Sequence, residues 1–231
     1  MKKYLLILDT SSVTGLCAIA EKDSRKIISS KYINAKSSHS EHLFLSIEET
    51  LSENKLDFSN IDTVVYTAGP GSFTGLRIAY SAVKGFTMAT GVKSHGVSTL
   101  KALIHNIKIF DGYKAVLVKG SANDVYVLIE DENCNVLIKE DCYEMDKILS
   151  MIKKICSLGK RITCIGSGAL FYKDLLINES EDISIPTEEA INLVSPEGML
   201  SLLEQKSIDD INYLKASYAE IKQNKNEADK K

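Results

Sequence analysis

The sequence predicts an α/β protein with two related halves, and three observations lead to this fold class. Short apolar runs typical of buried strands alternate with longer amphipathic stretches typical of helices. Each half begins with several strands and contains a strand that runs into a glycine turn and then a helix, although no residue-level repeat is visible. The length of 231 residues, with 44% apolar and 26% charged residues, fits one or two globular domains.

Three strands are predicted at the start of the chain. The apolar run at residues 4–8 ends at Asp9 and further polar residues, which is typical of a buried strand followed by a turn. Residues 15–20 follow at hairpin distance, and residues 27–33 alternate weakly, as a third strand would.

The first helix is predicted from the capping-box spacing of Ser38 and Glu41 to about Asn54. Its core side is expected to consist of Leu43, Phe44, Ile47 and Leu51, whereas Leu45 points away from that side. A further strand at residues 62–68 and a helix at residues 76–90 complete the order β-β-β-α-β-α.

The helix at residues 76–90 is apolar on two sides, which indicates burial on two sides. One of these sides is a stripe of mostly small residues, namely Ile78, Ala82, Gly85 and Ala89. Such a stripe lets another helix approach closely, either from this chain or from a partner protein. We expect a partner, with Leu45 extending the same surface, so a bulky side chain at Ala82 should weaken association more than it destabilises the monomer.

The second half is predicted to contain strands at residues 114–119, 125–129, 136–139 and 162–165, with helices at residues 145–156 and from Ser195. We therefore divide the chain into an N-terminal lobe at residues 1–108 that carries the partner surface and a C-terminal lobe at residues 109–221. The last helix of the second lobe is a candidate to pack back on the first. Residues 222–231 are almost entirely polar and are expected to be a disordered tail.

Charge and cysteine content exclude several classes of protein. A net charge of −3 does not suit a free-standing nucleic-acid binder, which needs a basic surface. The five cysteines are odd in number and include no C-x-x-C spacing, which argues against a disulfide framework or a structural zinc site. No run of residues is long and apolar enough for a membrane span. We expect a soluble cytoplasmic protein without membrane association.

Two features are weak candidates for a ligand site. The segment from Gly69 through Gly71 to Gly75 links a strand to a helix, where backbone N–H groups suit an anion. It lacks the P-loop spacing, so the glycines equally fit a tight turn with close packing. Asp9 at a strand end could hold a hydrated metal ion or cap a turn. The histidines show no spacing that predicts a metal site.

Several motifs in order carry a specific resemblance. They are Asp9-Thr10-Ser11, His39-Ser40-Glu41, the segment AGPGSFTGLRI at residues 68–78 and GVSTL at residues 96–100. Together they resemble the TsaB (YeaZ) family, the bacterial dimerisation subunits of the machinery that makes threonylcarbamoyladenosine (t6A) in tRNA. The resemblance implies a two-lobed actin-like, Hsp70-like (ASKHA, ribonuclease H-like) fold with mixed sheets and flanking helices.

The resemblance also bears on catalysis. TsaD, the catalytic paralogue of the family, binds a metal through two histidines four residues apart, and the matching positions here hold Thr99 and Leu103. Neither side chain can replace imidazole on a transition metal. The resemblance therefore implies no catalytic residue, no metal site and no required cofactor, and it leaves nucleotide binding open. The second lobe departs from the family pattern at Lys119-Gly120-Ser121 and at residues 211–215.

The function predicted on this basis is a noncatalytic scaffold. It would bind a TsaD-like threonylcarbamoyltransferase through the helices at residues 41–54 and 76–90, for modification of adenosine 37 in tRNA. A TsaE-like ATPase would join the complex, tRNA would be bound only through it, and the chain alone would form a homodimer. Two alternatives are an actin-like ATP-binding phosphotransferase or ATPase that uses Asp9 and residues 69–75, and a metallopeptidase.

Overall fold

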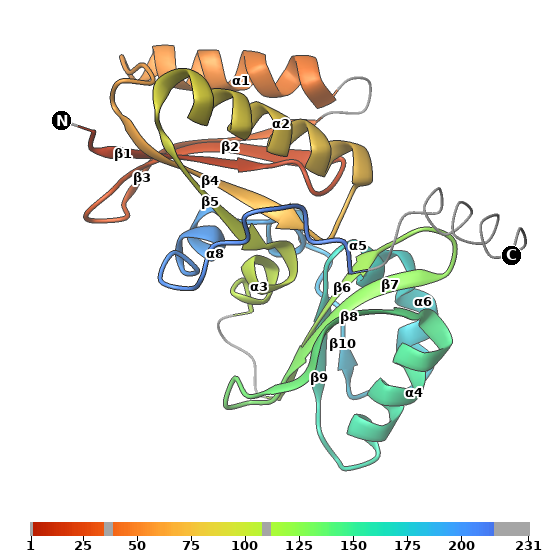
Figure 1. Ribbon diagram of the computed structural model, residues 1–231. Helices are drawn as coiled ribbons and strands as arrows, with labels where there is room; N and C mark the ends of the chain where they lie inside the picture. The colour runs from red at the N-terminus through yellow and green to blue at the C-terminus, as the bar shows by residue number, and fades with distance from the viewer. Residues whose placement is uncertain (1, 35–38, 108–111, 215–231) are drawn as a thin grey trace, which may run out of the picture.

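The protein consists of two lobes, each built on a mixed five-stranded sheet with helices packed against it (Figure 1). The computed structural model describes residues 2–34, 39–107 and 112–214. The predicted lobe boundary at residue 108, the capping residue Ser38 and the tail at residues 222–231 all lie outside the described residues.

The first sheet has the strand order β3-β2-β1-β4-β5. Antiparallel pairing joins its first three strands, and β4 and β5 then continue parallel to β1. The strands are β1 (Tyr4–Asp9), β2 (Thr14–Glu21), β3 (Ile27–Asn34), β4 (Ile61–Gly69) and β5 (Lys93–Ser98). Almost every residue of β1 and β2 is buried, because this sheet is covered on both faces.

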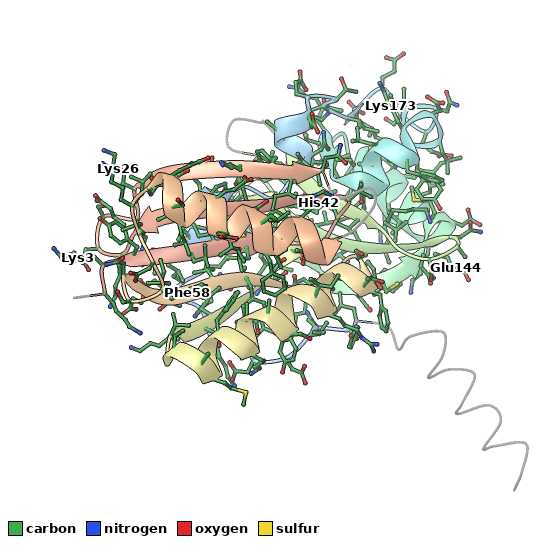
Figure 2. The ribbon with its side chains drawn as sticks, turned by 90° about the horizontal axis from the view of Figure 1, so that it is seen from above. Lys3, Lys26, His42, Phe58, Glu144 and Lys173 are labelled. Atoms are coloured by element: carbon green, nitrogen blue, oxygen red, sulfur yellow. The ribbon has the colours of Figure 1, made fainter. Side chains whose placement is uncertain are left out.

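Helices α1 (His39–Glu53) and α2 (Phe73–Thr90) cover one face of the first sheet, and Figure 2 shows them lying side by side over the strands. Their buried residues form a core with the side chains of β1, β2 and β4 that face these helices. The Ser72 hydroxyl caps α2 by accepting a hydrogen bond from the Gly75 N–H, and Gly91 ends the helix in a left-handed conformation at φ 67°.

The second sheet has the order β10-β9-β6-β7-β8, which repeats the topology of the first sheet when read in reverse. Antiparallel pairing joins β8, β7 and β6, and β9 and β10 then continue parallel to β6. Its strands are β6 (Tyr113–Lys119), β7 (Asp124–Glu130), β8 (Val136–Glu144), β9 (Ile162–Ile165) and β10 (Ile183–Ser184). The helices of this lobe are α4 (Met145–Cys156), α5 (Ser167–Phe171), α6 (Lys173–Ile177) and α7 (Glu189–Asn192). The repeated strand order confirms the prediction of two related halves.

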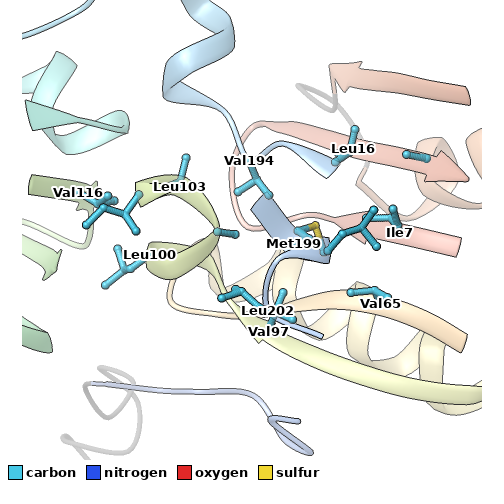
Figure 3. Packing of buried hydrophobic residues seen from close by; sticks show 14 of the residues in the cluster. Ile7, Leu16, Val65, Val97, Leu100, Leu103, Val116, Val194, Met199 and Leu202 are labelled. Carbon is cyan, nitrogen blue, oxygen red and sulfur yellow. The ribbon is translucent and has the colours of Figure 1, made fainter. Parts of the chain in front are cut away.

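One hydrophobic core joins the two lobes around α3 (Thr99–Ile104) and α8 (Pro196–Leu200). Figure 3 shows Ile7 and Val65 of the first sheet, Leu103 of α3, Met199 of α8 and Val116 of the second sheet around this core. The Ser98 hydroxyl, which caps α3, also donates a hydrogen bond to Glu140 of β8. The two sheets therefore share buried surface in addition to a chain connection.

Comparison with the predicted elements shows where the sequence pattern is informative. The strand at residues 162–165 and the helix at residues 145–156 are confirmed with the same bounds. The pattern does not predict β5 and α3, and α2 begins at Phe73 rather than at Leu76. Within the described ranges, the helices are all too short or too polar to cross a bilayer.

Candidate functional site

Asp9 ends β1, and its carboxylate is buried in the turn that leads to β2. Asp9 Oδ1 accepts hydrogen bonds from the backbone N–H of Ser11 at 2.9 Å and from the Thr67 hydroxyl at 2.6 Å. Burial raises the pKa of the Asp9 carboxyl above its ordinary value, and these hydrogen bonds offset part of that rise. Because only 1% of Asp9 is exposed, the carboxylate fastens the turn instead of facing solvent.

Gly71 and Gly75 lie directly against the same turn. A Cβ on Gly75 would be 2.0 Å from the carbonyl oxygen of Thr10, and one on Gly71 would be 2.4 Å from that of Ser11. The Thr10 hydroxyl donates to the Gly75 carbonyl at 2.7 Å, and the Ser72 N–H donates to the Ser11 carbonyl at 2.7 Å. A side chain at either glycine would therefore collide with the turn after β1. Of the two interpretations of this segment, the geometry favours close packing.

Gly69, the third candidate glycine, is also explained by the backbone. Its φ of +114° is one that side-chain-bearing residues rarely adopt. A Cβ there would also be 3.0 Å from the carbonyl oxygen of Asn212, whose own N–H donates to the Ala68 carbonyl at 2.7 Å. The C-terminal segment thus passes directly over the end of β4.

Thr99 and Leu103, the positions that match the metal ligands of TsaD, lie on α3 inside the molecule. Thr99 is 1% exposed and Leu103 is 3% exposed, and Leu103 packs in the core between the lobes. Across the described ranges, His, Cys, Asp and Glu side chains do not come together in any group of three that could hold a metal ion.

An apolar groove of about 670 Å³ runs between α1 and α2 on the surface of the first lobe, and we call it the α1–α2 groove. Its lining is apolar or uncharged except at Arg77. The described residues that line it are Phe44, Phe73, Thr74, Arg77, Ile78, Ser81, Ala82, Gly85 and Phe86. A second groove of about 640 Å³ continues beyond Phe44 and Phe86, which line both. The rings of these two residues pack edge to face, with their centroids 6.0 Å apart.

The structure distributes the predicted interface residues over different environments. Ile78, Ala82 and Gly85 line the α1–α2 groove, whereas Ala89 is exposed near the end of α2 and Leu45 is 54% exposed on α1 outside the groove. Ala82 is only 7% exposed and belongs to the core beneath the helices. A bulky residue at Ala82 would therefore overpack this chain's own core, so it does not separate association from monomer stability. A Cβ added at Gly85 would meet no atom within 4 Å, so that position faces open space.

Two aromatic residues of the groove are missed by the sequence analysis. The pattern predicts Phe44 on the core side of α1, but it is 49% exposed. The pattern also places Phe73 before the start of the predicted helix, but this residue begins α2 and is 41% exposed. Phe44 sits at the edge of the apolar arc of α1, so its surroundings depend on the neighbouring helix. For Phe73, Ser72 as an N-cap residue is the signal that places it on the helix.

A family model confirms the resemblance. The model described as TsaD, tRNA N6-adenosine threonylcarbamoyltransferase, matches residues 26–223 of this chain. A relative from Buchnera aphidicola subsp. Schizaphis graminum, named tRNA threonylcarbamoyladenosine biosynthesis protein TsaB, is 28% identical over 199 residues. That alignment covers 79% of this chain and 92% of the relative.

Solved structures show the same fold. YeaZ from Pseudomonas aeruginosa superposes with a TM-score of 0.64 at 20% identity, covering 87% of this chain and 90% of that one. A Bacteroides thetaiotaomicron protein described as having an actin-like ATPase fold superposes with a TM-score of 0.51 at 10% identity, covering 87% and 96%. The two mixed sheets are thus the predicted two-lobed actin-like fold. The chain belongs to the family of the TsaD model and, within it, to the TsaB (YeaZ) proteins.

Proposed function

We propose that this chain is a noncatalytic scaffold subunit that acts in the biosynthesis of threonylcarbamoyladenosine in tRNA by binding a TsaD-like catalytic paralogue. Relatives along most of its length carry the name of that biosynthesis. The observation that carries the scaffold role is the α1–α2 groove, an apolar surface with exposed aromatic side chains on two adjacent helices. Exposed apolar surface of this kind marks interaction sites.

The groove supports docking of two helices from the partner onto α1 and α2. Phe44 and Phe73 are large side chains that are about half exposed, and aromatic residues are typical anchors of protein interfaces. Gly85 offers room for close approach of a partner backbone. The complex would be a helix bundle across the interface.

The absence of chemistry in this subunit is supported by the way its candidate groups are used. The Asp9 carboxylate accepts a hydrogen bond within its own turn, and Gly71 and Gly75 pack against backbone atoms of that turn. Leu103 is a core residue at a position that matches a metal ligand of TsaD. The paralogue therefore supplies the transfer reaction, and this chain needs no cofactor of its own.

The remaining partners follow from the same role. A TsaE-like ATPase joins the complex, and the chain without its paralogue forms a homodimer through the same helices. With a net charge of −3, the chain contacts tRNA only through the assembled complex, in the cytoplasm.

Co-expression tests the proposal. The tagged chain should co-purify with the TsaD-like paralogue of the same genome, and the pair with the TsaE-like ATPase should form t6A from tRNA and threonylcarbamoyl-adenylate. Omitting this chain should abolish product, whereas Asp9→Asn should preserve it. Product formed by the chain without the paralogue, or no co-purification, would contradict the scaffold role.

A further inference from the structure

Among the described residues that line the α1–α2 groove, Arg77 alone is charged, and aromatic residues hold its guanidinium in place. Its Cζ lies 3.7 Å from the centroid of the Phe73 ring. Its Nε donates a hydrogen bond to the Tyr213 hydroxyl at 3.0 Å. A guanidinium that is already stacked and hydrogen-bonded loses little further freedom when it binds a ligand.

Tyr213 is in turn positioned by the C-terminal segment. The rings of Tyr213 and Phe73 lie 5.5 Å apart, and the preceding residue, Asn212, donates its N–H to Ala68 at the end of β4 at 2.7 Å. Further back, the N–H of Ile208 donates to the Gly96 carbonyl at 2.9 Å. A segment that departs from the family pattern thus crosses the end of the first sheet and fixes the orientation of Arg77.

Among the residues that the structure describes, the guanidinium has no acidic partner. Arg77 forms no ion pair with any residue that the structure describes, and Nε is the one nitrogen with a hydrogen bond to them. A partner helix that covers the groove would remove Arg77 from water. Burying a charged group without an opposite charge is costly, so the covering surface must provide one.

We infer that Arg77 is a specificity-determining residue of this interface and that it binds an Asp or Glu carboxylate on the paralogue's docking helix. This inference rests on the proposed function. A protein carboxylate fits better than a nucleic-acid phosphate, because the groove around Arg77 is apolar whereas phosphate backbones are bound by groups of basic residues. The terminal N–H groups of Arg77 form the planar fork that a carboxylate accepts.

The test measures the Kd of the full-length chain for the purified paralogue by calorimetry. Arg77→Met keeps an unbranched side chain that can contact the Phe73 ring but removes the charge and the N–H groups, and it should raise Kd about 10- to 100-fold. Lys84→Met is the matched control, because Lys84 also lies near an aromatic ring of α2, 5.1 Å from the centroid of Tyr80, but outside the groove. It should change Kd by less than about twofold.

The salt dependence of binding and a variant of Tyr213 distinguish an ion pair at Arg77 from apolar packing alone. Arg77→Glu should bind even more weakly than Arg77→Met, and raising NaCl from about 0.05 to 0.5 M should recover part of its affinity. Tyr213→Phe, which removes only the hydroxyl that holds Nε, should weaken binding less than Arg77→Met does. Thermal melts of each variant confirm that it is folded.

Each contrary outcome has a distinct meaning. If the wild-type chain does not bind the paralogue, the proposed function itself fails. If it binds but Arg77→Met matches Lys84→Met, the carboxylate contact is wrong. Loss of tRNA binding by the assembled complex at unchanged subunit Kd would assign Arg77 to a phosphate, and an effect confined to the homodimer would assign the carboxylate to a second copy; both overturn the inference.

Discussion

Gly75 in α2 lies so close to Thr10 that a Cβ on Gly75 would be 2.0 Å from the Thr10 carbonyl oxygen. The Thr10 hydroxyl also donates to the Gly75 carbonyl at 2.7 Å. A glycine turn of a kind that can bind phosphate in α/β proteins is used here to join α2 to the first sheet. This contact places α2, and therefore the groove between the helices, at a fixed distance from the turn after β1.

Replacement of Gly75 tests this contact. Gly75→Ala forces its new methyl group against backbone, which cannot move aside as a flexible side chain can. We expect a loss of about 1–3 kcal/mol in the free energy of unfolding, measured by urea denaturation. An alanine variant as stable as the wild type would show that the turn is not packed as described.

The same substitution at Gly85 should have the opposite effect. Gly85 is exposed in the middle of α2, and a Cβ there meets no atom within 4 Å. Because alanine favours the helix over glycine, Gly85→Ala should raise the free energy of unfolding by about 0.5–1 kcal/mol. Urea curves of the two alanine variants, recorded side by side, check both signs.

Asp9 should make stability depend on pH. Its pKa is raised in the folded state, so between the ordinary and the raised value the folded protein binds more protons than the unfolded chain does. Stability contributed by this group is therefore greatest at low pH and falls as pH rises through that window. Asp9→Asn cannot titrate, and its amide oxygen can accept the same two hydrogen bonds.

We therefore expect the free energy of unfolding of Asp9→Asn to increase relative to that of the wild type as the pH rises above about 4, the ordinary pKa of an aspartate. Urea denaturation at several pH values measures the difference. An identical pH dependence in both proteins would mean that the carboxyl is not desolvated.

Ser98 and Glu140 connect the lobes and can be tested as a pair. Ser98→Ala removes a helix cap and the hydrogen bond to Glu140, and should cost about 1–3 kcal/mol. Ser98→Asp keeps a capping acceptor but places a second carboxylate next to Glu140, so repulsion should destabilise the protein. Adding Glu140→Gln should restore most of the lost stability. If Glu140→Gln gives no recovery, the contact between Ser98 and Glu140 contributes nothing to stability.

The fold was predictable where local pattern and burial agree. The helix Met145–Cys156 was found with its bounds because its apolar residues follow one face. The strand Lys93–Ser98 was not predicted, because it lies at the edge of its sheet and its first three residues are polar, with Lys93 exposed and the next two only partly buried. Its place is determined by pairing with β4, which is not visible in the six residues themselves.

The candidate site was predictable only in part, for a similar reason. Ile78 and Gly85 of the predicted apolar stripe line the α1–α2 groove. The stripe could not show that Ala82 belongs to the core or that Phe44 is half exposed, because both depend on how α1 and α2 pack. The contact between Arg77 and Tyr213 joins residues 136 positions apart, and no local pattern encodes it.

The central claim is that the paralogue docks in the α1–α2 groove, and one substitution at its exposed floor tests it most directly. Gly85→Trp fills the groove without entering the core, because Gly85 faces open space. Lys154→Trp, at an exposed position of α4 in the second lobe, is the matched control. The measurement is the Kd for the paralogue, alongside the melting temperature of each variant. We predict that Gly85→Trp melts at or above the wild-type temperature yet binds at least about 100-fold more weakly, while Lys154→Trp binds normally. A folded Gly85→Trp variant with wild-type affinity would contradict the account.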